Sequence, residues 1–204
     1  MGDAQLLITG VVLAGGLGRR MGDVDKGLQP LHGRPMVAAV IERFSPQVDE
    51  LLINCNQNFD RYAAFGRRIV ADQMPGFAGP LAGLQVALGA ASHPLVATVP
   101  CDSPDLPKDL VHRLAAALQA AAADIAVAST DGRLHPVFCL CRRTLLPHLT
   151  DFLAGGGRQF GLWFSTLNTV EVAFDDQAAA FININTADEL ARHAQTLAGR
   201  ERKS

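Results

Sequence analysis

The chain has 204 residues, of which 49% are hydrophobic, and this size and composition are typical of one globular domain with a full core. The formal net charge of −2 excludes a general electrostatic attraction to nucleic acid or to acidic membranes. No apolar run approaches the roughly 18 residues that span a membrane. We therefore expect a single domain over residues 1–204, with no nucleic-acid or membrane partner.

The N-terminal segment, MGDAQLLITGVV, has an acidic residue and no basic stretch, which argues against a secretory signal peptide. The four cysteines form no C-x-x-C pair and show no spacing to histidine that is typical of zinc. They are Cys55, Cys101, Cys139 and Cys141. Buried thiols are the favoured interpretation, and a reducing cytoplasm fits it.

An apolar run over residues 6–14 predicts a buried strand that stops at Gly15 and Gly16. The glycine-rich loop that follows carries three cations, Arg19, Arg20 and Lys26. Glycines let the backbone turn with positive φ and bring its N–H groups close to phosphate oxygens. Arginine and lysine side chains then neutralise the phosphate charge. This pattern predicts a loop that binds a nucleoside triphosphate.

Two common phosphate loops do not fit this stretch. The dinucleotide fingerprint G-x-G-x-x-G begins at Gly16 and Gly18, but its last glycine comes one place late, at Gly22. That fold also needs an acidic residue roughly 20 positions further on, where the chain offers only Glu42. The ATPase-type loop fails because the residue after Lys26 is glycine and not serine or threonine.

Residues 13–28 do match the nucleotidyltransferase signature L-A-G-G-x-G-x-R-M-G-x-x-D-K-G-L. So many fixed positions make this match far more specific than a lone G-x-G. Asp23 stands where glycine is usual and adds a negative charge to the loop, where it either faces solvent or forms a local turn bond. The competing interpretation is a flexible turn with solvated basic residues.

Apolar residues at helical spacing after Pro35 predict a helix, and a core-facing stripe explains them: Met36, Val37, Val40, Ile41 and Phe44. Residues 51–55 predict a second buried strand. Asn54 and Asn56 lie at its end, where open α/β sheets place groups that bind ligands. A pair of turn-forming asparagines is the alternative.

A short helix over 58–65 and a strand over 68–71 are predicted next, followed by a Pro/Gly-rich loop from Asp72 to Gly83. The loop leads into a helix that continues to about residue 91, and Pro80 suits the first turn of that helix. Small residues here would let a ligand lie close to the backbone. A simple connection between elements is the alternative.

A third apolar strand begins at Leu95 and ends near Asp102, which stands between two prolines. A carboxylate at this edge of a sheet is well placed to hold Mg²⁺, which prefers one or two carboxylates and completes its shell with water and phosphate oxygens. Asp102 could instead cap the next helix, but Asp105 suits that role better because the helix is expected to start near Pro107.

The second half of the chain predicts a helix over 107–122, strands over 124–128 and 133–140, and a helix over 144–153. His135 either faces a substrate or, as we favour, is a structural histidine. The aromatic segment 157–164, with Arg158 and Trp163, is interpreted as core in preference to a ligand clamp. Thr186 and Glu189 form a capping box for a final helix.

Four blocks together resemble the molybdenum cofactor guanylyltransferases, a branch of the nucleotidyltransferases. They are the loop over 13–28, the aspartate followed by GPLAG over 72–83, PCDSPDLP over 100–107 and FININT over 181–186. The resemblance implies an α/β, three-layer Rossmann-like fold with a mostly parallel central sheet. It also implies Mg²⁺-dependent transfer of GMP from GTP to molybdenum-bound molybdopterin in the cytoplasm, giving the guanine dinucleotide cofactor and pyrophosphate.

The resemblance further assigns nucleotide-binding positions, which are Leu13, Ala14, Gly15, Gly16, Gly18, Lys26, Asn54, Asp72, Gly83, Asp102, Asn183 and Asn185. Arg20, Lys26 and Asp102 are expected to be catalytic, with Asp102 as the magnesium ligand. Residues 1–100 would mainly bind the nucleotide, residues 101–198 the metal and the acceptor, and residues 199–204 form a tail. Transient contact with proteins that deliver molybdopterin and load molybdoenzymes is also implied.

Other functions remain open at this point. A related cytidylyltransferase or a sugar-phosphate nucleotidyltransferase would use the same loop, because the loop contacts phosphates and not the base. A catalytically silent regulator that binds GTP is a second alternative. A nicotinamide oxidoreductase is disfavoured by the failed dinucleotide fingerprint.

Overall fold

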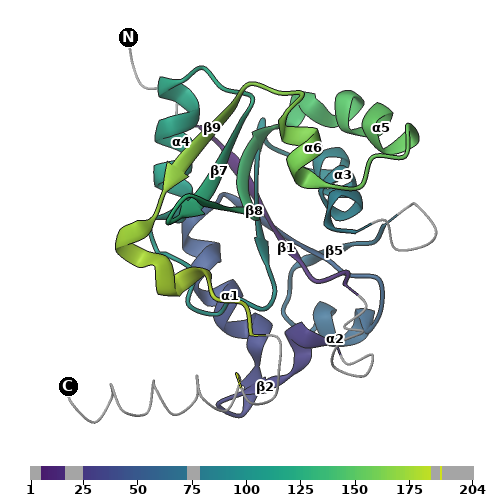
Figure 1. The fold of residues 1–204 in the computed structure, drawn as a ribbon. Coiled ribbons are helices and arrows are strands. Elements are labelled where there is room, and N and C mark those ends of the chain that lie inside the picture. The colour runs from purple at the N-terminus through teal and green to yellow at the C-terminus, as the bar shows by residue number, and fades with distance from the viewer. Residues whose placement is uncertain (1–5, 17–24, 73–78, 185–188, 190–204) are drawn as a thin grey trace.

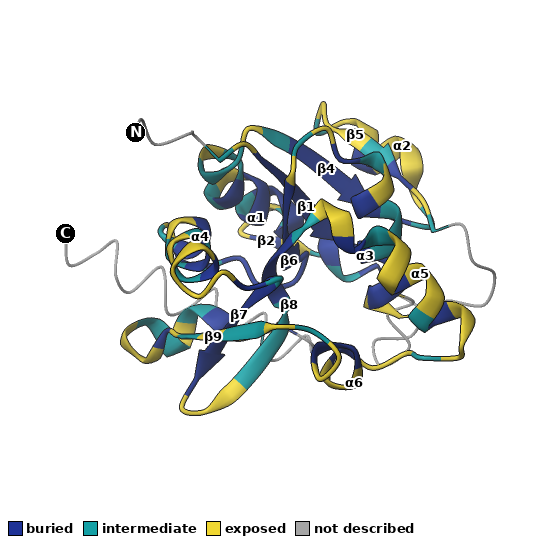
Figure 2. Cartoon of the chain, turned by 90° about the horizontal axis from the view of Figure 1, so that it is seen from above, coloured by how far each residue is buried: buried dark blue, intermediate teal, exposed yellow. Residues whose placement is uncertain are grey.

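A seven-stranded sheet runs through the centre of the molecule and has helices on both faces (Figures 1 and 2). The computed structural model describes residues 6–16, 25–72, 79–184 and 189. These residues form a three-layer α/β/α architecture in which most strand pairs are parallel. The predicted fold class is therefore confirmed.

The sheet strands are β1 (Ile8–Leu13), β4 (Glu50–Asn54), β5 (Arg68–Val70), β6 (Leu95–Pro100), β7 (Ile125–Thr130), β8 (Arg133–Arg142) and β9 (Thr169–Ala173). A small separate hairpin pairs β2 (Pro30–Leu31) with β3 (Arg34–Pro35). The helices are α1 (Met36–Phe44), α2 (Phe59–Ala63), α3 (Pro80–Ala90), α4 (Leu110–Ala120), α5 (Leu146–Ala154) and α6 (Phe160–Phe164). Short 3₁₀ turns cover Lys26–Leu28, Ser45–Gln47, Arg143–Leu145 and Asp175–Phe181.

The strand order β5-β4-β1-β6-β8-β7-β9 places β1 between β4 and β6, and it is parallel to both. After β1 the chain builds outward through β4 and β5, and it then returns to the other side of β1 as β6. This reversal of direction is a topological switch point. In open α/β sheets, the crevice beyond the carboxyl ends of the strands at such a point is where ligands bind.

β8 runs antiparallel to both of its neighbours, β6 and β7. A tight turn joins β7 to β8, and its residues Asp131 and Gly132 have φ values of 49° and 72°. Two consecutive positive φ angles are typical of the type I′ turns that favour Asp-Gly. Because β7 is parallel to β1 in direction, this hairpin tip lies at the same edge of the sheet as the carboxyl ends of β1 and β6.

Alternation along the strands divides the core between the two faces of the sheet. Val12 of β1 belongs to the cluster formed with α1 and α4, whereas Val11 belongs to the cluster formed with α3, α5 and α6. Figure 2 shows α1 and α4 on one side of the sheet and α3, α5 and α6 on the other. Gly10 permits close packing of α1, because a Cβ atom there would lie 2.8 Å from the ring of Phe44.

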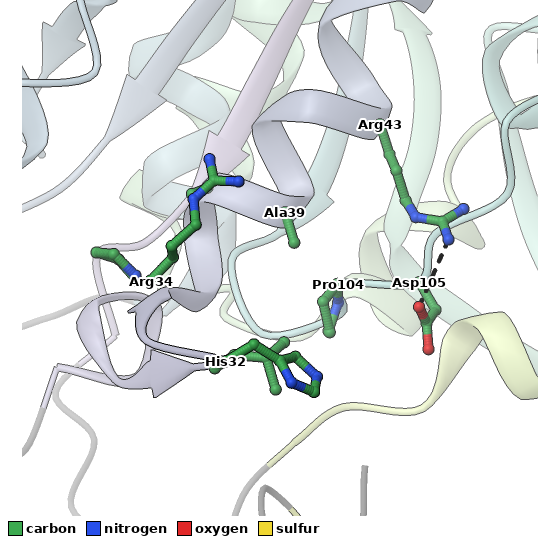
Figure 3. A pocket seen from close by; sticks show the side chains of 9 residues that line it. His32, Arg34, Ala39, Arg43, Pro104 and Asp105 are labelled. Carbon is green, nitrogen blue, oxygen red and sulfur yellow. Dashed lines mark ion pairs between the residues drawn. The ribbon is translucent and has the colours of Figure 1, made fainter. Parts of the chain in front are cut away.

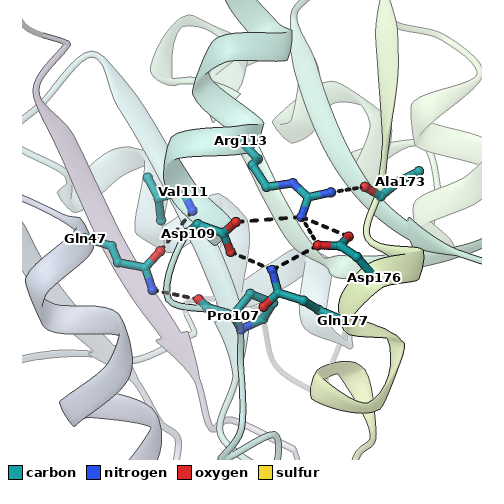
Figure 4. Close-up of polar contacts among 8 residues, drawn as sticks. All are labelled: Gln47, Pro107, Asp109, Val111, Arg113, Ala173, Asp176 and Gln177. Carbon is teal, nitrogen blue, oxygen red and sulfur yellow. Dashed lines mark hydrogen bonds and ion pairs between the residues drawn. The ribbon is translucent and has the colours of Figure 1, made fainter.

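Polar contacts fasten the segment after β6 to its surroundings (Figure 4). Gln47 donates to the carbonyl of Pro107 at 2.9 Å and accepts from the backbone N–H of Val111 at 3.0 Å. On the other side, Gln177 donates to the Asp109 carboxylate at 3.0 Å. These contacts tie the start of α4 to the Ser45–Gln47 turn and to the Asp175–Phe181 turn, so the loop that follows β6 is held at both sides.

The elements predicted between residues 6 and 164 occur, with boundaries that shift by a few residues, whereas the final helix predicted after Thr186 falls mostly outside the described residues. The helix predicted from Pro107 begins three residues later as α4, and Pro35 ends β3 just before α1 instead of opening the helix. β9 was not predicted, because only two of its five residues have branched apolar side chains and the segment around them is polar. No helix in the described ranges is long and apolar enough to cross a bilayer.

The aromatic segment after α5 is part of the core. Trp163 of α6 is fully buried, and its indole N–H donates to Nδ1 of His148 at 3.0 Å. Arg158 donates to carbonyls of its own loop, at Leu153 and Gly157. These contacts support the interpretation of residues 157–164 as packing elements. Thr186 of the predicted capping box lies outside the described residues.

Candidate nucleotide and metal site

The carboxyl end of β1 is tied to both neighbouring strands. The backbone N–H of Ala14 donates to the carbonyl of Asn54 at 2.8 Å, and the N–H of Cys101 donates to the carbonyl of Leu13 at 3.2 Å. Leu13 and Ala14 are buried, whereas Gly15 is partly exposed and Gly16 is exposed. The loop that leaves β1 therefore emerges between the ends of β4 and β6, at the switch point of the sheet.

Lys26 and Asp102 meet at this point from opposite sides. The ammonium Nζ of Lys26 lies 3.3 Å from Oδ2 of Asp102, an ion pair between residues 76 positions apart in the chain. Asp102 is buried and only 7% exposed. Burial raises the pKa of its carboxyl group, and the Lys26 charge opposes that rise. The site therefore contains a carboxylate that has lost most of its water and depends on a nearby cation.

A second polar network forms at the ends of β4 and β5. Asn54 donates to Oδ1 of Asp72 at 2.9 Å, and Asn56 donates to Oδ2 of the same carboxylate at 2.8 Å. The backbone N–H of Asp72 in turn donates to Oδ1 of Asn56 at 2.9 Å, and Asn56 also reaches the carbonyl of Gly15 at 3.2 Å. The Asp72 carboxylate is consequently fixed in orientation by two amides.

Two glycines make room for these amides. A Cβ atom on Gly15 would lie 2.7 Å from Nδ2 of Asn56, and one on Gly83 would lie 2.5 Å from Oδ1 of Asn54. Real Cβ atoms essentially never approach so closely. Gly83 lies in the first turn of α3, so its missing side chain brings that helix against the Asn54 amide. The sequence positions of these glycines therefore reflect packing around Asn54 and Asn56.

Asn183 lies on the Asp102 side of the site. Its Oδ1 accepts a hydrogen bond from the hydroxyl of Ser103 at 2.7 Å. The next residue, Ile184, donates its backbone N–H to the carbonyl of Asp102 at 2.9 Å. The segment over residues 182–184 is thus attached directly to the residue that carries the buried carboxylate.

The structure brings the predicted residues together in two adjacent groups. One group surrounds the β1–β4 end and contains Leu13, Ala14, Gly15, Asn54, Asp72 and Gly83. The other surrounds the β6 end and contains Lys26, Asp102 and Asn183. Gly16 follows the first group. Gly18, Arg20, Asp23 and Asn185 lie outside the described residues.

The protein supplies only some of the ligands that a magnesium ion needs. Within the described ranges, no group of three or more His, Cys, Asp or Glu side chains is arranged to hold a metal. Asp102 offers a buried carboxylate at the end of β6, whereas both oxygens of the equally buried Asp25 are taken by Tyr62 and Asn58. Because Mg²⁺ is commonly held by one or two carboxylates together with substrate phosphates and water, a single carboxylate here fits the ion in the presence of a nucleotide.

The sequence did not predict the contacts among Asp25, Asn58 and Tyr62, which support Lys26. The carboxylate of Asp25 is buried and accepts hydrogen bonds from Tyr62 and Asn58, both contributed by α2 and its first flanking residue. The D-K pair within the loop motif pointed to Asp25 as a fixed position, but the chain gave no sign of its partners. They come from a helix that joins the site only through tertiary packing.

His135 has a structural environment. Its Nε2 lies 2.7 Å from the hydroxyl of Thr130, and its ring stacks on Phe181 at 4.8 Å between centroids. Burial lowers the pKa of its imidazole, and the nearby Arg133 charge lowers it further. An imidazole bonded to a threonine and stacked on a phenylalanine agrees with the interpretation of His135 as a packing residue.

A surface pocket of about 210 Å³ lies beside α1 and the β2–β3 hairpin (Figure 3). Its cations already have acidic partners: Arg43 pairs with Asp105 at 3.6 Å, and Arg34 pairs with Glu42 at 2.5 Å. Ala38, Ala39 and Pro104 supply an apolar floor. The pocket does not include the polar side chains at the strand ends, so it is separate from the site described above.

A three-layer sheet whose glycine-loop lysine faces a buried carboxylate at the switch point defines the nucleotidyltransferase class. The MobA-like NTP transferase domain matches residues 10–165. Molybdenum cofactor guanylyltransferase from Cupriavidus necator is 51% identical over 191 residues, which cover 91% of this chain and 96% of that protein. The enzyme of the same name from Shewanella putrefaciens is 47% identical over 184 residues, covering 90% and 94%.

Solved structures show the same fold. Molybdopterin-guanine dinucleotide biosynthesis protein A from Archaeoglobus fulgidus gives a TM-score of 0.78 at 23% identity, over 94% of this chain and 99% of that chain. The 4-diphosphocytidyl-2C-methyl-D-erythritol synthase from Anaerococcus prevotii gives 0.73 at 14% identity, over 94% and 98%. On the sequence matches, the chain belongs to the molybdenum cofactor guanylyltransferase family.

Proposed function

We propose that this protein transfers GMP from GTP to the terminal phosphate of molybdenum-bound molybdopterin, forming the guanine dinucleotide cofactor and pyrophosphate. The observation that carries the proposal is the ion pair of Lys26 with Asp102 at the switch point, in a chain about half identical to relatives named for this activity. The pair joins a phosphate-binding cation to a carboxylate of the kind that holds Mg²⁺.

In the proposed reaction, an oxygen of the molybdopterin phosphate attacks the α-phosphorus of GTP and pyrophosphate leaves. A phosphate monoester has a second pKa of about 6 and is already an anion at neutral pH, so no strong general base is needed. The protein must therefore hold two anions together and offset the charge that develops between them. This requirement explains why the site needs cations and fixed N–H groups more than it needs a histidine.

Each side chain has a defined role in this scheme. Lys26 exchanges its contact with Asp102 for the nucleotide phosphates, and Arg20 adds a second cation. Asp102 would hold Mg²⁺, which would withdraw charge from the phosphate oxygens. The backbone N–H groups of the loop over 13–18 contact the phosphates. Lys26 and Asp102 thereby both exchange their mutual contact for new partners during binding.

The Asp72 network is assigned to the nucleoside. Because Asn54 and Asn56 fix both oxygens of the carboxylate, Asp72 is an oriented acceptor suited to the N–H or O–H donors of a base or ribose. Gly83 supports this network because its missing Cβ lets α3 pack against the Asn54 amide, and we assign Asn183 and Asn185 to nucleotide binding as well. Under this proposal residues 1–100 handle mainly the nucleotide, and residues 101–198 the metal and the acceptor.

The proposal also covers the cellular setting. All four cysteines are buried and unpaired, which agrees with a reducing cytoplasm. GTP and molybdopterin are the small-molecule partners, and contact with proteins that deliver molybdopterin and load molybdoenzymes follows from the need to pass on a bound cofactor.

The test is a direct assay of the product. The purified protein is given Mg²⁺, a carrier loaded with molybdopterin, and either GTP or CTP, and the pterin product is analysed by mass. We expect the guanine dinucleotide with GTP and a much slower reaction with CTP. A strong preference for CTP would make the protein a cytidylyltransferase, and GTP binding without product would make it a silent regulator.

A further inference from the structure

The carboxylate of Asp25 is held by two donors at once. It is only 7% exposed. The hydroxyl of Tyr62 donates to Oδ1 at 2.6 Å, and the side-chain amide of Asn58 donates to Oδ2 at 3.0 Å. Because each oxygen has its own donor, rotation of the carboxylate would break at least one bond to a buried group. Asp25 is therefore fixed against α2.

The backbone conformation of Asn58 is unusual, and its side chain makes this contact. It occupies the N-cap position of α2 in the left-handed conformation, with φ of 54° and ψ of 36°. Asparagine tolerates this region better than most residues, although it is still unfavourable. The Asn58 side chain makes no capping bond to its own helix, although N-cap asparagines usually do, and it reaches Asp25 instead. Asn58 therefore gives up its usual capping bond to α2 and contacts Asp25 instead.

Tyr62 is buried beneath the turn that carries Lys26. It has no exposed surface, and its hydroxyl would lie 2.6 Å from a Cβ atom on Gly27. Burial raises the pKa of the phenol strongly, and the hydrogen bond to Asp25 raises it further. A raised pKa keeps the phenol protonated, so the hydroxyl acts as the donor to Asp25. Gly27 has no side chain because the hydroxyl occupies that space.

The 3₁₀ turn Lys26–Leu28 begins at this anchor. The carbonyl of Asp25 accepts the N–H of Leu28 at 3.2 Å, and the carbonyl of Lys26 accepts the N–H of Gln29 at 3.1 Å. The side chain of Lys26 leaves the anchored turn and reaches Asp102 on the far side of the switch point.

We infer that Tyr62 and Asn58 are positioning residues for Lys26: by holding Asp25 they fix the turn Lys26–Leu28, and so direct the lysine ammonium to the anion-binding point beside Asp102. The inference rests on the proposed function where it assigns Lys26 to nucleotide phosphates. Lysine has a flexible four-carbon stem, and ordering such a side chain costs conformational entropy. An anchored backbone leaves less of this cost to be met when the anion binds.

The chain allows a direct readout of Lys26. It contains three lysines, Lys26, Lys108 and Lys203, so reductive methylation with ¹³C gives a simple NMR spectrum. Loss of one signal in Lys26→Arg assigns the Lys26 resonance, and Asp102→Asn shows where it lies without the ion pair. We expect Tyr62→Phe, which keeps the ring and removes the hydroxyl, to shift this resonance toward its Asp102→Asn position.

A second readout is the affinity for GTP·Mg²⁺, measured by calorimetry. We expect Tyr62→Phe and Asn58→Gly to weaken binding about tenfold, the scale on which losing one hydrogen bond to a buried carboxylate is felt. Glycine is chosen at position 58 because it accepts the positive φ. In a Lys26→Ala background the effect of Tyr62→Phe should largely disappear, since a group that acts through Lys26 has nothing left to position.

Thr98→Val is the matched control, because it also removes a buried hydroxyl, which donates to the carbonyl of Val137 at 2.6 Å. We expect it to lower the melting temperature without moving the Lys26 resonance. An unmoved Lys26 resonance in Tyr62→Phe, or additive losses in the Lys26→Ala background, would refute the positioning role. The NMR comparison needs no nucleotide, so it decides the inference even if the product assay rejects the proposed function.

Discussion

Gly83 and Asn54 fit together without space for a methyl group, since a Cβ atom at position 83 would lie 2.5 Å from Oδ1 of Asn54. The same atom would lie 3.0 Å from Cδ2 of Leu13. Asn54 holds Asp72 and belongs to the carboxyl end of β4, so a helix, a strand end and the Asp72 network converge on one small volume. This close packing explains why the first turn of α3 contains a glycine at position 83.

Gly83→Ala should therefore displace the Asn54 amide and release one oxygen of Asp72. We expect the affinity for GTP to fall about tenfold, because the partly buried Asp72 carboxylate would lose one of the two amides that orient it, and one hydrogen bond is worth about 1 kcal/mol. Gly89→Ala is the control on the same helix: its Cβ would meet only Leu146, at 3.9 Å. Calorimetric titration should show normal GTP binding for this variant, together with a gain in stability of up to about 1 kcal/mol. Equal binding by both variants would contradict the assigned role.

Asp102→Asn should stop the reaction while the fold is retained. The amide keeps the shape of the carboxylate but loses the charge that pairs with Lys26 and would hold Mg²⁺. We expect the rate of dinucleotide formation to fall by about a hundredfold or more, the scale on which a single electrostatic group acts in a transition state. Circular dichroism should be unchanged, and a near-normal rate would remove Asp102 from the mechanism.

The same variant makes a prediction about stability and pH. Burial raises the pKa of Asp102 above its ordinary value of 3.8, so the folded protein binds this proton more tightly than the unfolded chain does. The stability contributed by this group is therefore highest at low pH and is lost as pH rises through the raised pKa. Asp102→Asn should melt at an equal or higher temperature than the wild type at pH 7, and this advantage should shrink toward pH 4. A lower melting temperature at pH 7 would mean that the Lys26 contact outweighs the cost of burial.

The cysteines should be unreactive in the folded protein. All four are buried, and burial raises the pKa of Cys55 to about 11 and that of Cys139 to about 12. Since the thiolate is the reactive form, DTNB at pH 8 should label less than about one thiol per native molecule and all four after unfolding. Rapid labelling of the native protein would show that one of these sites opens to solvent.

Arg113 should matter for stability and not for catalysis. Its guanidinium carbon lies 3.9 Å from the centre of the buried Phe174 ring, and its Nη1 donates to Asp176 at 3.0 Å (Figure 4). Arg113→Ala should destabilise the fold by about 1–2 kcal/mol in urea unfolding, with kcat unchanged. Gln119→Ala, at an exposed position of the same helix, should stay within about 0.5 kcal/mol of the wild type.

The meeting of Lys26 and Asp102 could be predicted because both residues follow buried strands, and the carboxyl ends of parallel strands share one edge of the sheet. The contacts of Asp25 could not. They depend on where α2 lies, and a five-residue helix gives little periodicity from which to place its faces. The separate hairpin of β2 and β3 could not be predicted, since two-residue strands carry no alternation to detect. Sequence periodicity thus predicts where strands end, but it does not predict where a short helix such as α2 packs.

Because β8 reverses direction, the turn before it can be changed without changing the strands next to the glycine loop. Its tight hairpin at Asp131–Gly132 lies at the functional edge, yet it is covalently remote from the strands that carry the glycine loop. Lengthening that hairpin would add residues at this edge of the sheet and leave the β4–β1–β6 register untouched. We expect loop grafts at this tip to be tolerated by the fold, which makes it a natural place to engineer recognition of a different acceptor.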